Sequence, residues 1–145
     1  MAYDVLVGVD TSDASRRAVQ FACRWQAEHA DRPLLLVHVV PWSPYSFNTP
    51  QENEQRHRKH EAEMTAANAQ VLQPMQELAQ AAGCAAETIV RHGDRVEILH
   101  TIAREESVGL IVVGRTGDSG IKERLFGGLA SHLVQSSPVP VVVVP

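Results

Sequence analysis

The residues with the clearest potential for chemistry are glycines that follow an apolar run. Gly114, Gly117 and Gly120 come directly after Leu110–Val113, and the pair Gly127–Gly128 precedes a short helical pattern. Glycines let backbone N–H groups approach an anion closely, and a helix N-terminus adds unpaired donors and a favourable dipole. The spacing therefore favours binding of a phosphate or another anion. The alternative is a tight loop without a ligand.

The sequence around these glycines excludes two familiar phosphate loops. Arg115, Lys122 and Arg124 add positive charge, which Asp118 and Glu123 partly offset. No Gly-Lys-Ser/Thr occurs, and no Gly-x-Gly-x-x-Gly follows the first apolar run, so neither a P-loop nor the dinucleotide fingerprint is present. We expect a phosphate-bearing ligand held by a different kind of loop.

Asp10 is the second candidate, because it ends the apolar run Val5–Val9. A carboxylate at the carboxyl end of a strand can accept hydrogen bonds from ribose hydroxyls, at the same sheet edge as the glycines. Thr11 and Ser12 are good N-cap residues for a following helix. The alternative is that Asp10 or Thr11 only caps that helix.

Five short apolar runs predict the strands that must position these residues. They are Val5–Val9, Leu34–Val40, Thr88–Val90, Leu110–Val113 and Val139–Val144. The second, fourth and fifth are nearly continuous Val, Leu and Ile, which is typical of strands buried on both faces of a parallel sheet.

Segments of helical periodicity separate the apolar runs. Apolar residues recur at spacings of three and four around Ala14–Trp25 and Val96–Ala103, with Asp94 able to cap the latter. Gln51–Ala82 is polar and rich in helix formers, and Pro74 should kink or split it. Strands alternating with helices predict a doubly wound, Rossmann-like α/β fold with helices on both faces. Without a repeat or linker, we predict a single domain over residues 1–145.

The composition narrows the class of protein. The formal net charge is -4 and the charged residues are mixed in sign, so we expect no nucleic-acid partner. No apolar run approaches the ~20 residues that cross a bilayer, and the N-terminus lacks the basic region of a secretion signal. Two isolated cysteines, Cys23 and Cys84, indicate a reducing compartment. We therefore predict a cytoplasmic protein without membrane contact.

Other residues have side chains that could form a metal or catalytic site. His57 and His60 have helical spacing and could ligate a metal with a neighbouring glutamate. Charged residues at this spacing more often form a solvent-exposed helix face. We therefore predict no metal site. His38 is expected to be a satisfied core residue. No paired carboxylates and no Cys/His arrangement suggest catalysis. The aromatic residues of the proline-rich segment 41–50 either pack on the sheet edge or cover a ligand.

The successive segments of the chain resemble the universal stress protein family. The likeness covers essentially the whole chain, and its most specific part is Gly, two residues, Gly, nine residues, Gly, found here as Gly114, Gly117 and Gly127. In the ATP-binding branch this motif wraps the phosphates. The other matching segments are Val7–Ser12, Leu36–Val39, Gly93, Ile111–Gly114 and Pro138–Val144.

The resemblance implies a five-stranded parallel sheet in the order 3-2-1-4-5 and a homodimer that pairs through the last strand, Val139–Val144. It implies ATP or another adenine nucleotide, with or without Mg²⁺, with Asp10 at the ribose and the backbone around Val39 at the adenine. Family members generally regulate stress tolerance through protein partners, with weak or no ATP hydrolysis. The expected nucleotide-binding residues are Asp10, Thr11, Val39, Val113, Gly114, Arg115, Gly117, Gly127 and Gly128.

One position departs from the ATP-binding branch. Gly128 stands where the branch has Ser or Thr, and Ala130 where a further hydroxyl is common. A hydroxyl that donates to a charged phosphate contributes roughly 1.5–3 kcal/mol, so its loss would weaken binding about ten- to hundredfold. We expect retained but weaker nucleotide binding, the nucleotide acting as ligand or switch. A nucleotide-free dimeric interaction protein and a slow ATPase are the alternatives.

Overall fold

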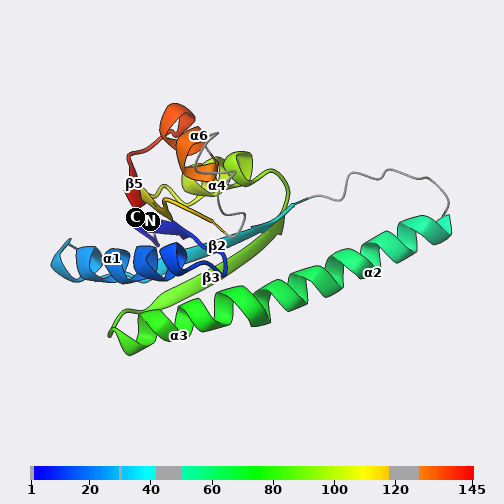
Figure 1. Cartoon of the computed structure of the whole chain (residues 1–145), viewed down its shortest axis with the longest axis horizontal. Coiled ribbons are helices and arrows are strands. Elements are labelled where there is room, and N and C mark those ends of the chain that lie inside the picture. The colour runs from blue at the N-terminus through cyan, green and yellow to red at the C-terminus, as the bar shows by residue number, and fades with distance from the viewer. Residues whose placement is uncertain (1, 30, 42–49, 118–127) are drawn as a thin grey trace.

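Five parallel strands form one sheet in the order β3-β2-β1-β4-β5 (Figure 1). The computed structural model describes residues 2–29, 31–41, 50–117 and 128–145. The strands are β1 (Val5–Gly8), β2 (Leu34–Val40), β3 (Ala86–His92), β4 (Leu110–Gly114) and β5 (Val141–Val144). The predicted doubly wound sheet and its strand order are confirmed.

β1 and β4 end within one residue of the prediction, whereas the bounds of β3 and β5 differ from it by two residues for physical reasons. β3 extends beyond Thr88–Val90 at both ends, because polar Glu87 and Arg91 still pair in register with β2. β5 begins at Val141 and not at Val139, directly after Pro140.

Alternate residues of the strands face two separate hydrophobic layers. One layer packs under α1 (Asp13–His29) and α3 (Gln73–Ala81), and the other under α4 (Arg95–Glu105) and α6 (Leu129–Ser136). In Figure 1 these helix pairs lie on opposite sides of the sheet. The first layer takes Val5, Val7, Leu34, Leu36 and Val112, and the second takes Leu6, Leu35, Val37, Ile111 and Val113. Every one of these side chains is at most 1% exposed, so both faces of the sheet are covered.

Side chains at two helix starts fix where the helices begin. Ser12 precedes α1, and its Oγ accepts a hydrogen bond of 3.1 Å from the backbone N–H of Ser15. Ser12 therefore caps α1, and the Asp10 carboxylate accepts from the N–H of Ser12 itself. The predicted Asp94 cap of α4 is confirmed, because its carboxylate accepts from the N–H of Glu97 at 3.0 Å.

Pro74 splits the long helical segment, as predicted. A π-helical turn, η1 (Asn68–Leu72), separates α2 (Pro50–Ala67) from α3, and Pro74 lies in the first turn of α3. The N–H of Gln73 reaches back five residues to the carbonyl of Asn68. The wider turn accommodates a proline that has no N–H and whose ring would clash inside a regular helix.

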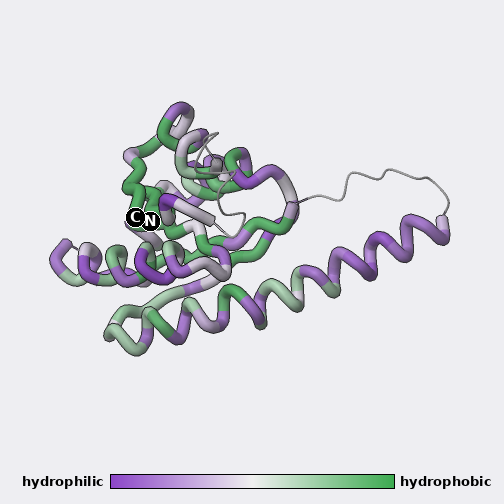
Figure 2. Tube along the Cα trace, in the orientation of Figure 1, coloured by the Kyte–Doolittle hydropathy of each residue, from purple (hydrophilic) through white to green (hydrophobic). Residues whose placement is uncertain are grey.

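Helix α2 extends beyond the rest of the molecule (Figure 1). Only Ala67, its last residue, is buried, and most residues along the helix are hydrophilic (Figure 2). Pairs at i and i+4, such as His57 with Glu61 at 3.0 Å, run along it. No helix in the described ranges is long and apolar enough to cross a membrane.

Candidate functional site

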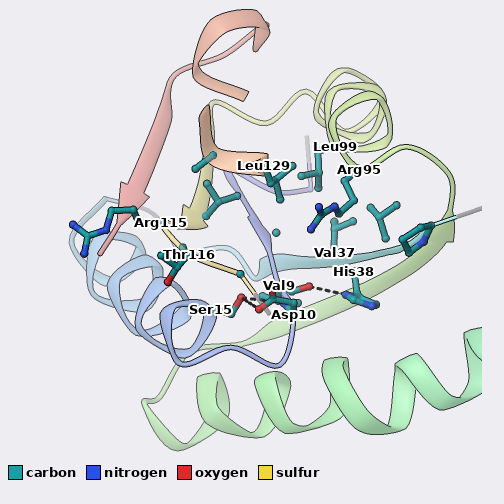
Figure 3. A pocket seen from close by; sticks show the side chains of 17 residues that line it. Val9, Asp10, Ser15, Val37, His38, Arg95, Leu99, Arg115, Thr116 and Leu129 are labelled. Carbon is teal, nitrogen blue, oxygen red and sulfur yellow. Dashed lines mark hydrogen bonds between the residues drawn. The ribbon is translucent and has the colours of Figure 1, made fainter. Parts of the chain in front are cut away.

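A cavity of about 210 Å³ opens at the carboxyl ends of β1, β2 and β4. The chain reverses its direction of winding between β1 and β4, which is where doubly wound sheets bind ligands. The first turns of α1, α4 and α6 also line the cavity, through Ser15, Arg95 and Leu129 (Figure 3). Three helix N-termini therefore face one cavity, which favours an anionic ligand.

Asp10 is held rigidly where it meets the cavity. Its Oδ1 accepts hydrogen bonds from the N–H of Ser12 at 2.8 Å and from the Oγ of Ser15 at 2.9 Å. The same Oγ accepts from the N–H of Asp10 at 2.9 Å, and Ser15 is only 3% exposed. Ser15 thus positions the carboxylate without being exposed itself.

His38 lies in the same cavity with a defined tautomer. Its Nδ1 is 2.7 Å from the carbonyl oxygen of Val9 (Figure 3). A carbonyl only accepts, so Nδ1 carries the proton and Nε2 is the acceptor of the neutral ring. His38 is hydrogen-bonded as expected, but it is only partly buried and lines the cavity, so the expectation of a core residue is wrong.

Gly114 has a packing role that the sequence did not reveal. A Cβ placed on it would lie 2.7 Å from the Cβ of Ala14 and 2.8 Å from its carbonyl carbon. The glycine therefore allows the first turn of α1 to lie directly against the end of β4. This close approach brings the N-terminus of α1 to the cavity.

Most predicted site residues that the structure describes meet at this cavity. Asp10, Val39, Val113, Gly114, Arg115 and Gly117 line it. Thr11 and Gly128 are described but are not among the lining residues, although Leu129 and Ala130 are. Gly127 lies outside the described residues, as do Gly120, Lys122, Arg124 and the aromatic residues of the proline-rich segment.

One cation of the cavity, Arg95, was not among those that the sequence suggested. The exposed side chain of Arg115 extends away from the other lining residues in Figure 3, while that of Arg95 points between Leu99 and Val37. Sequence reasoning missed Arg95, Ser15, His38 and Thr116 as lining residues. A usable signal existed for Arg95, because it directly follows the helix cap at the end of a strand.

His60 of α2 forms a separate cluster with His92 at the end of β3. The ring of His60 lies 4.5 Å from that of His92, whose Nε2 is 3.2 Å from the Oε2 of Glu63. Burial and the neighbouring His92 lower the pKa of His60. No group of three or more His, Cys, Asp or Glu in the described part of the chain could hold a metal ion.

Comparisons with known proteins agree with the fold. The model of the Universal stress protein family matches residues 1–145. The universal stress protein YxiE of Bacillus subtilis is 29% identical over 153 residues, covering 97% of each chain. The structure of universal stress protein UspA from Lactobacillus plantarum has a TM-score of 0.79 at 25% identity, covering 99% of this chain and 98% of that one.

A third relative was solved with a ligand. This universal stress protein, in complex with cAMP, has a TM-score of 0.65 at 26% identity, covering 100% of this chain and 98% of its own. These similarities extend over nearly the whole chain. The resemblance predicted from the sequence is confirmed, and this chain belongs to the universal stress protein family.

Proposed function

We propose that this chain binds an adenine nucleotide, ATP or a nucleoside monophosphate, in the cavity at the carboxyl ends of β1, β2 and β4. The observation that carries the proposal is the order in which apolar side chains, a carboxylate and a glycine-bearing segment line the cavity. In Figure 3 apolar Val37 and Leu99 lie on one side of Asp10, and Thr116 of the glycine-bearing segment after β4 lies on the other. A nucleotide presents base, ribose and phosphate in the same order.

Each part of the cavity suits one part of the nucleotide. The apolar side chains can bury the faces of a purine, and the Asp10 carboxylate can accept from ribose hydroxyls. Backbone N–H groups near Gly114 and Gly117, with the helix N-termini, suit phosphate oxygens. The relative with cAMP bound supports an adenine nucleotide in this family fold.

In this proposal the nucleotide acts as a regulatory ligand in a cytoplasmic stress response. The described cavity offers no pair of titratable groups arranged for proton transfer, so slow ATP hydrolysis is the lesser candidate. Mg²⁺ would arrive with a triphosphate and be held mainly by its oxygens. The free thiols of Cys23 and Cys84 support a reducing location.

Titration calorimetry and thermal shift with ATP and cAMP test the proposal. We expect saturable binding and a raised unfolding temperature. Asp10→Asn should weaken binding about ten- to hundredfold, because one hydrogen bond to a charged group contributes roughly 1.5–3 kcal/mol. Asp13→Asn is the matched control, since Asp13 is exposed in the first turn of α1. Neither heat nor thermal shift at high protein concentration would refute binding and favour the nucleotide-free interaction protein.

We also propose that two copies pair through β5. This strand ends the sheet, and all four of its valines remain partly exposed. The carbonyl of Pro140 accepts from the N–H of Ile111 in β4 at 3.0 Å, and that of Val144 accepts from the N–H of Arg115, directly after β4, at 2.7 Å. Because successive residues of a strand point to opposite sides, Val141 and Val143 direct their N–H and C=O groups outward. Such a bare apolar edge is stabilised by pairing with a second copy.

Sedimentation equilibrium at micromolar concentration tests the pairing. The wild type should have the mass of a dimer. Val143→Pro removes an outward N–H without removing a hydrogen bond to β4, so it should give a folded monomer. Val143→Thr keeps the N–H and the branched side chain and should remain dimeric. A wild type that is monomeric, or a Val143→Pro variant that is fully dimeric, would contradict pairing through this edge.

A further inference from the structure

The side chain of Arg95 occupies the part of the cavity where the proposed function puts the base. Arg95 is the first residue of α4, and its side chain points between Leu99 and Val37 (Figure 3). Val37 and Leu99 belong to the hydrophobic layer under α4, and each is 1% exposed. A guanidinium in these apolar surroundings loses hydration, so its hydrogen bonds to a ligand become stronger.

The position of Arg95 is locally unfavourable for a cation. The N-terminus of a helix carries partial positive charge, so acidic residues are preferred in the first turn and basic ones in the last. Here Arg95 directly follows the cap residue Asp94, whose carboxylate accepts from the N–H of Glu97. Residues that break a local rule tend to lie at functional sites. Its place at this helix start therefore makes Arg95 a candidate functional residue of the cavity.

The chemistry of a guanidinium discriminates between purines. It has five donors in a planar fork and no acceptor. Guanine presents two neighbouring acceptors, O6 and N7, whereas adenine presents N7 beside the N6 amino group, which donates. A guanidinium can therefore bond both acceptors of guanine but only one atom on this edge of adenine.

We propose that Arg95 contacts the purine edge of the bound nucleotide and makes this cavity accept guanine nucleotides at least as well as adenine nucleotides. This inference rests on the proposed nucleotide binding and identifies the residue that sets its base preference. Arg115 also lines the cavity, but its exposed side chain extends away from Arg95 and Val37 in Figure 3.

The test measures the affinities of ATP, GTP and ITP for the full chain by calorimetry. ITP carries O6 and N7 without the 2-amino group of guanine, so it isolates the edge that Arg95 is proposed to read. For the wild type we expect GTP and ITP to bind no more weakly than ATP. In Arg95→Gln, whose amide suits N6 and N7 of adenine, GTP and ITP should lose about fivefold or more relative to ATP.

Two further variants separate this role from a general effect of charge. Arg104→Gln removes the same charge from the exposed end of α4 and should keep the wild-type affinity ratios. Arg95→Lys keeps the charge but loses the planar fork, so it should lose the preference as Arg95→Gln does. Circular dichroism confirms that each variant is folded.

Three results would overturn the inference. An unchanged GTP-to-ATP affinity ratio in Arg95→Gln, with ATP still bound, removes the inference and leaves the proposed function intact. If Arg95→Gln lowers the affinity for all three nucleotides equally and Arg95→Lys restores it fully, Arg95 contacts the phosphates and not the base. Failure of all three nucleotides to bind the wild type overturns the proposed function together with this inference.

Discussion

The packing of Gly114 against α1 leads to a quantitative prediction. Alanine at this position would put its Cβ 2.7 Å from the Cβ of Ala14 and 2.8 Å from its carbonyl carbon. The obstacle is the backbone of a helix and not a flexible side chain, so α1 and β4 must move apart. Overpacking of this kind costs about 1–3 kcal/mol. For a chain of this size we expect the unfolding temperature of Gly114→Ala to fall by about 3–10 °C.

Thermal and urea unfolding, followed by circular dichroism, measure the effect. Gly109→Ala is the control, because its Cβ would only meet the carbonyl oxygen of Asp4 at 3.8 Å, an ordinary contact. Adding Ala14→Gly to Gly114→Ala removes the shortest contact but not the backbone one, so a double-mutant cycle should show partial rescue. A Gly114→Ala variant as stable as the wild type, or no rescue at all, would refute the assigned role of this glycine.

Three further predictions follow from particular side chains. Gly128→Ser should tighten nucleotide binding about tenfold; calorimetry showing equal affinity would contradict this. Burial raises the pKa of the Cys23 thiol to about 12, so a thiol reagent at pH 8 should label Cys84 rapidly and Cys23 only after unfolding; equal rates would argue against it. Burial lowers the pKa of His100, so the unfolded state binds the proton of this ring more tightly than the folded state. The stability contributed by the neutral ring is therefore present above pH 6.5 and is lost as the pH falls. Urea unfolding between pH 8 and 5 should show this slope, which His100→Gln should reduce.

The fold was predictable because its determinants are short-range and periodic. Leu34–Val40 and Leu110–Val113 are nearly continuous apolar runs, and this pattern alone indicates strands buried on both faces. Asp94 and Pro74 act within a few residues of their own position, so their effects on helix boundaries could also be predicted. The ends of β3 were missed because pairing with β2, and not hydrophobicity, extends that strand.

The candidate site was only partly predictable, because its members meet through tertiary packing. Asp10, Gly114 and Gly117 stand at strand ends, where position in the sequence already indicates position in the fold. The direction of a side chain has no such signal, which is why Arg95 was not expected in the cavity. Likewise, the clash that makes Gly114 necessary involves Ala14, which is distant in sequence and close only in the folded chain.

The projecting helix α2 affects how the size of this protein should be measured. Its 18 residues span about 27 Å at 1.5 Å per residue, whereas a compact chain of this length has a radius of gyration of about 15 Å. An elongated particle has more friction per unit mass, so a gel-filtration column calibrated with compact proteins would overestimate its mass. A monomer could then elute where a dimer is expected. Scattering at small angles should accordingly show a maximum dimension well above that of a sphere of the same mass.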